Sequence, residues 1–204
     1  MKFLVTILLL LLSLTCSGQS KYELNCEPYL IELSRDSMLA QVGVKEKTGH
    51  NDGYKVEQYL KSVGLKKGNP YCAAGQYWCF AVNAKKTTDI PIPKSGLANS
   101  AFNYAKKHGV KVGYFPAIDD LLIWQIAKAI QGHIERITKV INAKFVMTVG
   151  FNTSNGKKGS QSDGNGVFPR IRDLFNPIGR LLIKGLVGIK PIRTTAEKQG
   201  CNVK

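Results

Sequence analysis

Residues 70–84, PYCAAGQYWCFAVNA, are the stretch from which the fold of this chain can be predicted. The apolar spacing predicts a helix from Tyr71 to Ala84, and a helix that is apolar on most sides is a buried helix. Pro70 suits the start of such a helix, where backbone N–H groups have no intrahelical partner. Cys72 therefore lies at the N-terminus of a buried helix, a position that favours a thiolate.

Periodicity on either side of this stretch separates the chain into a helical half and a strand-rich half. Apolar residues recur at helical spacing in three further segments, 28–45, 54–63 and 98–108. Short apolar or alternating runs follow at 121–124, 133–141, 144–149, 167–168 and 181–189. We predict an α+β domain in which N-terminal helices pack on a C-terminal antiparallel β-sheet of about five strands.

A histidine begins the alternating run that follows the helical half. His133 comes directly after Gly132, whose missing side chain leaves room beside the ring for a substrate or for Cys72. An imidazole that takes the proton of a thiol is the minimal equipment of a cysteine hydrolase. The structural alternatives are a small core cysteine at Cys72 and a hydrogen-bonded histidine at the sheet edge at His133.

A cysteine–histidine pair needs a third group that orients the imidazole. The hairpin predicted around Asn142 returns the chain towards His133, and Asn152 follows its second strand. Asn152 is therefore the candidate for the third position. The alternative is that Asn152 opens a loop, where asparagine is common without any function.

The two ends of the chain are predicted to differ from the domain between them. Lys2 precedes an apolar run too short to span a membrane, and small residues follow it, so residues 1–18 resemble a signal peptide cleaved before Gln19. The alternative is lipid attachment at Cys16. Residues 19–192 would form one domain, followed by a polar tail over 193–204. We therefore expect export to the periplasm or the exterior, as a free protein or a lipoprotein.

The charge of the chain bears on which molecules it could bind. Beyond residue 18 there are 28 Lys and Arg against 14 Asp and Glu, a formal charge of +14. An exported protein this basic is expected to meet anionic polymers such as cell wall, although solubility alone is the simpler explanation. No nucleic-acid motif is present.

Cys72 and Cys79 are too far apart along one helix to bridge, whereas Cys26 and Cys201 could form a disulfide.

Several motifs then resemble cysteine peptidases of the CHAP type (cysteine- and histidine-dependent amidohydrolases/peptidases), which are related to NlpC-like and papain-like enzymes. The resemblance covers roughly residues 35–190, and the collinear order of the motifs is more specific than any one of them. The matching segments are Thr48-Gly49-His50-Asn51-Asp52-Gly53, Asn69-Pro70-Tyr71-Cys72-Ala73-Ala74 with Trp78-Cys79, Asp120 to Trp124, Gly132-His133-Ile134, Thr148 to Thr153, and Asp163 to Val167.

This resemblance implies a papain-like fold and cleavage of peptidoglycan amide bonds by Cys72, His133 and Asn152, as an endopeptidase or an amidase. It implies no cofactor and no metal, and we expect a monomer whose partner is peptidoglycan or another anionic wall polymer. The glutamate of the family pattern falls on Gly150, which cannot orient an imidazole. A weakened or inactive module that binds cell wall is therefore the alternative, and a toxin against competing bacteria would share the same chemistry.

Overall fold

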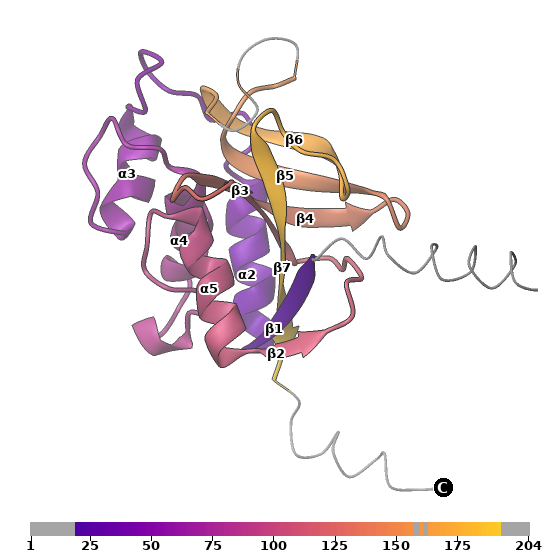
Figure 1. Cartoon of the computed structure of the whole chain (residues 1–204). Helices are drawn as coiled ribbons and strands as arrows, with labels where there is room; N and C mark the ends of the chain where they lie inside the picture. Colours follow the sequence, from indigo (N-terminus) through magenta and orange to yellow (C-terminus); the bar gives the residue numbers. More distant parts are fainter. Residues whose placement is uncertain (1–18, 157–159, 161–162, 193–204) are drawn as a thin grey trace, which may run out of the picture.

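A computed structural model describes residues 19–156, 160 and 163–192 of the chain (Figure 1). In this part the chain is α+β, with four α-helices on a seven-stranded sheet. The helices are α2 (Pro28–Leu39), α3 (Tyr54–Ser62), α4 (Cys72–Ala81) and α5 (Ala98–His108), with a short 3₁₀ helix at Thr87–Asp89. All four predicted helices are confirmed, and α5 has the predicted bounds.

The sheet is mixed, with the order β2-β1-β7-β3-β4-β5-β6. Strand β1 pairs parallel with β7, and every other neighbouring pair is antiparallel. The strands are β1 (Ser20–Cys26), β2 (Val110–Val112), β3 (Leu121–Ile126), β4 (Gly132–Val140), β5 (Phe145–Thr153), β6 (Gly166–Asp173) and β7 (Leu181–Pro191).

The prediction of about five strands, all antiparallel, is wrong: the sheet has seven strands, and one neighbouring pair, β1 and β7, is parallel. The two missed strands are β1 and β2, and β1 lies inside the sheet between β2 and β7. Strand β1 was hard to recognise because it contains Lys21 and Glu23, although Lys21 is only 3% exposed. Strand β2 has only three residues and carries Lys111 between two valines.

Residues alternate between the two faces of the sheet. Ile123 and Ile134 pack with residues of α2, α4 and α5 in one hydrophobic cluster. Leu122 and Trp124 belong to a separate cluster, which contains Leu186 of β7 and no helical residue. Figure 1 shows the helices gathered on one side of the sheet, with β4, β5 and β6 extending beyond them. The side chains of β3 and β4 therefore contribute to both clusters.

A buried ion pair fixes β1 in the sheet. Lys21 Nζ lies 2.6 Å from Asp120 Oδ2, although Asp120 precedes β3 and β7 lies between the two strands. Gly188 of β7 makes this crossing possible, because a Cβ there would lie 2.9 Å from Lys21 Cε and 3.3 Å from Asp120 Oδ1. Both partners are buried, so each depends on the other for its neutralisation.

Several sequence predictions fall outside the described residues. They are the signal peptide over residues 1–18, lipid attachment at Cys16, the polar tail over 193–204 and the Cys201 half of the proposed disulfide. Within the described ranges, Cys72 and Cys79 are both buried free thiols. None of the helices described is long and apolar enough to cross a membrane.

We predict that Asp120→Asn destabilises the fold strongly, because Lys21 would lose its buried partner and keep only the partly exposed Glu23, 3.7 Å away. Removing one partner of a buried ion pair costs about 3–5 kcal/mol. Lys190→Gln provides a matched control, since the Lys190–Glu23 pair is partly exposed and should contribute less than about 1 kcal/mol. Urea unfolding of both variants measures the difference, and equal losses would contradict the role given to the Lys21–Asp120 pair.

Candidate active site

Cys72 is the first residue of α4, and Tyr71 is the residue that caps it. The first turn of a helix has unpaired N–H groups, which favour an anion at that position. Eight of the ten residues of α4 are buried. Gly75 permits this close packing, because a Cβ there would lie 2.2 Å from the Phe151 ring of β5. The packing of α4 on the sheet therefore fixes the place of Cys72.

His133 lies next to Cys72, as predicted. The Sγ atom of Cys72 is 4.0 Å from the carbonyl oxygen of Gly132, the residue directly before His133. The imidazole is fully buried, and its Nε2 atom is 3.0 Å from Glu135 Oε1. Its Nδ1 atom has no hydrogen-bond partner among the described residues. Nδ1 is therefore the nitrogen available to the Cys72 thiol.

Glu135 is held from three directions. It lies two residues after His133 on β4, so the two side chains share one face of the strand. Thr148 of β5 donates a hydrogen bond to Glu135 Oε2 at 2.6 Å. Arg172 of β6 donates from Nε to the same oxygen at 2.8 Å and from its second nitrogen to Oε1. The two-point contact of an arginine fixes a carboxylate in both position and direction.

Gly150 gives the Glu135 side chain its space. The two residues are paired across β4 and β5, and a Cβ on Gly150 would lie 2.6 Å from Glu135 Oε1. Any side chain at position 150 would therefore displace the carboxylate. The carboxylate beside the imidazole therefore comes from β4, opposite the glycine of β5.

The charges of this cluster move two pKa values in opposite directions. Burial alone lowers the pKa of His133, but the interactions with Cys72 and Glu135 outweigh it and raise that pKa to about 9. Burial alone raises the pKa of Glu135, but Arg172 and His133 outweigh it and lower that pKa to about 2. At neutral pH the imidazole is therefore protonated and the carboxylate ionised.

Trp124 covers this cluster from β3. It is paired with His133 across the two strands, and the ring centroids are 5.8 Å apart. The guanidinium of Arg172 lies over the same indole at 5.7 Å from its centroid. Both rings are fully buried. The charged groups are therefore shielded from bulk water, which strengthens their mutual interaction.

Asn152 does not occupy the predicted third position. It is fully buried at the end of β5, and its Nδ2 atom donates to Asp163 Oδ1 at 3.3 Å. Its backbone is left-handed, with φ of 55°, where the strand leaves its regular pairing with β6. The imidazole nitrogen that Asn152 was expected to orient is bonded to Glu135 instead. The spacing His-x-Glu on a strand, opposite a glycine, was the available signal for Glu135.

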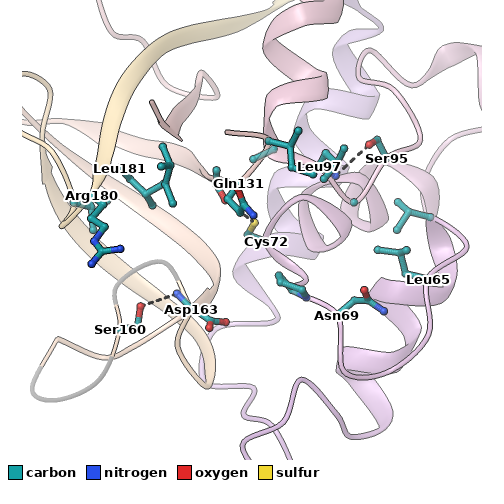
Figure 2. Close-up of a pocket in the computed structure, with 18 of the residues that line it drawn as sticks. Leu65, Asn69, Cys72, Ser95, Leu97, Gln131, Ser160, Asp163, Arg180 and Leu181 are labelled. Atoms are coloured by element: carbon teal, nitrogen blue, oxygen red, sulfur yellow. Dashed lines mark hydrogen bonds between the residues drawn. The ribbon is translucent and has the colours of Figure 1, made fainter. Parts of the chain in front are cut away.

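A cleft of about 990 Å³ opens beside the cysteine (Figure 2). Cys72, Pro70 and Asn69 form part of its floor, with Gly132 and Gln131 beside them. Figure 2 shows Cys72 between Leu65 and Leu97 on one side and Leu181 and Arg180 on the other. A cleft of this size, mostly apolar and with few polar groups, is typical of a ligand-binding site.

The other two histidines lie away from this cleft. His108, at the end of α5, stacks on Tyr104 with ring centroids 4.4 Å apart. His50 borders a separate polar hollow with Glu46 and Asp163. Within the described part of the chain, no group of three or more His, Cys, Asp and Glu side chains could hold a metal ion.

The chain has no significant match among models of protein families, curated proteins or solved structures.

We predict that Glu135→Gln lowers the pKa of His133 below its value of about 9, because the carboxylate no longer opposes the effect of burial and only the interaction with Cys72 remains to do so. An NMR titration of the ¹³C-labelled histidine rings measures this value.

Asn152→Gly is the control, since glycine accepts the left-handed backbone at that position and removes only the amide. The pKa of His133 should stay near 9 in that variant. A larger drop for Asn152→Gly than for Glu135→Gln would return the orienting role to Asn152.

Proposed function

We propose that this protein is an exported cysteine hydrolase that cleaves amide bonds of peptidoglycan, with a papain-like site of the CHAP type. The observation that carries the proposal is that Cys72, at the edge of an open cleft, contacts the carbonyl of Gly132 directly before His133, whose imidazole is bonded to Glu135. The collinear motifs over residues 35–190 and the formal charge of +14 beyond residue 18 support the same assignment. The basic surface would hold the enzyme near an anionic wall.

In the proposed reaction the Cys72 thiolate attacks the carbonyl carbon of the scissile amide, while His133 carries the proton. The tetrahedral intermediate collapses when Nδ1 of His133 protonates the leaving nitrogen, so the C–N bond breaks and a thioester remains. Water then attacks the thioester and passes a proton to His133. The acid leaves, and the thiolate–imidazolium pair is restored. Glu135 keeps its charge throughout and acts as a positioning residue.

The oxyanion of the intermediate needs two donors. The backbone N–H of Cys72 is one, because it belongs to the first turn of α4. The candidates for the second donor are residues near Cys72 in the sequence, namely Asn69, Tyr71 and Tyr54. Tyr71 is fully buried and Tyr54 is 77% exposed, and only Asn69 lines the cleft. Its Nδ2 atom donates to Lys66 at 2.9 Å and has a second hydrogen for the oxyanion.

The contacts of Glu135 bear on the alternative that the site has decayed. That alternative arose because position 150 is a glycine. Glu135 supplies a buried carboxylate to the imidazole, and Gly150 is required for its placement. Arg172 and Thr148 hold this carboxylate beside the imidazole, so the glycine at position 150 does not leave the imidazole without an acidic partner. An active enzyme is therefore favoured over a module that only binds cell wall.

We predict that purified peptidoglycan incubated with the wild-type protein releases muropeptides, and that Cys72→Ala lowers the release below about one thousandth of the wild-type rate. Mass spectrometry of the released fragments measures activity and identifies the bond. Cys79→Ala is a matched control, since Cys79 is an equally buried free thiol of the same helix outside the cleft.

Equal release by wild type and Cys72→Ala would show that the nucleophile is wrongly assigned. Sedimentation of the wild-type protein with peptidoglycan, without any released fragment, would support the wall-binding alternative instead.

A further inference from the structure

The cleft beside Cys72 has aliphatic walls and very few charges. Its aliphatic lining residues come from both sides and are Val63, Leu65, Leu97, Ala98, Ile126, Ile130, Ile178 and Leu181. Its ionisable lining residues other than Cys72 are Lys94, Asp163 and Arg180. All three belong to exposed residues, and they border an otherwise largely apolar lining. These three side chains are therefore the main electrostatic determinants of what the cleft accepts.

A tight hairpin turn presents Arg180 to the cleft. Ile178 and Leu181 exchange two backbone hydrogen bonds, of 3.0 and 2.9 Å, around the two central residues Gly179 and Arg180. Gly179 has φ of 57°, the left-handed value that a two-residue hairpin turn requires at its first central position. Leu181 is buried, so the turn is anchored on the side of the core. The backbone of Arg180 is thereby fixed at the wall of the cleft.

Arg180 forms no ion pair with a described residue. Asp163, the carboxylate that lines the same cleft, accepts a hydrogen bond from Asn152. Figure 2 shows Arg180 and Leu181 together on one side of Cys72, away from Leu65 and Leu97. Lys94 and Arg180 are both exposed, but Lys94 is a point charge on a flexible stem, whereas the guanidinium of Arg180 offers a planar pair of donors.

We propose that Arg180 is a specificity-determining residue that binds a free carboxylate of the substrate by a two-point contact. Peptides with a free carboxylate near the scissile amide would then be preferred over their carboxamide forms, while the aliphatic walls accept the rest of the chain. This assignment rests on the proposed function in one respect: the ligand of Arg180 is taken to be the amide substrate that binds in the same cleft.

The test measures binding rather than turnover, with Cys72→Ala as the background so that no probe is consumed. The probes are the tetrapeptide L-Ala-γ-D-Glu-L-Lys-D-Ala and the same peptide with both carboxylates converted to carboxamides. Isothermal titration calorimetry should show the carboxylate form binding about tenfold tighter, the usual effect of a hydrogen bond to a charged group. Adding Arg180→Gln should reduce this preference to less than about twofold.

Lys107→Gln is the matched control, because it removes one positive charge from an exposed position of α5 outside the cleft. The Lys107→Gln variant should keep the carboxylate preference. The wild-type cleft in the Cys72→Ala background should also keep it at higher salt, although the preference should then be smaller. The proposal is overturned by equal binding of the two peptides, by binding of neither, or by a preference that survives Arg180→Gln. A different result separates the two proposals. If Arg180→Gln abolishes the carboxylate preference but the wild-type protein hydrolyses no peptidoglycan, the proposed function is overturned and the carboxylate site stands.

Discussion

The structure depends on one buried carboxylate. Glu135 is shared by the imidazole of His133 and the guanidinium of Arg172, and these three residues come from β4 and β6. An isolated carboxylate at this depth would be strongly unfavourable, so its two cationic neighbours and the Thr148 hydroxyl are required for the fold as well as for the site. Together with Cys72, this carboxylate raises the pKa of His133, which links the stability of the sheet to the protonation of the candidate base.

Packing brings this carboxylate and the cysteine to one place. Helix α4 approaches β5 closely because Gly75 leaves room for the Phe151 ring, and β4 accepts the Glu135 side chain because Gly150 lies opposite. Each glycine therefore removes a specific collision: one sets the distance between helix and sheet, and the other sets the position of the carboxylate. Trp124 then excludes water from the charged cluster. Cys72 and Gly132 line the open cleft, whereas His133 and Glu135 are buried behind it, so the candidate nucleophile is the member of this cluster that a ligand could reach.

Much of this architecture could be predicted from local patterns, and the remainder depends on contacts between distant segments. The helix at 98–108 and the cysteine at the start of α4 follow from periodicity and from Pro70. Strand β1 could not be recognised in this way, because Lys21 looks like a surface residue until Asp120 is placed beside it, 99 positions away. The carboxylate beside the imidazole was equally hard to predict. Its place depends on the pairing of β4 with β5, which puts Gly150 opposite Glu135 and leaves space for the Glu135 side chain.

The central claim is that His133, supported by Glu135, activates the Cys72 thiol. The alkylation rate of Cys72 by iodoacetamide at neutral pH, followed by intact-protein mass spectrometry, tests it most directly. We predict a rapid rate that is lost in His133→Gln, because the thiol then has no neighbouring imidazole to assist it. A rate that is unchanged in His133→Gln would contradict the account.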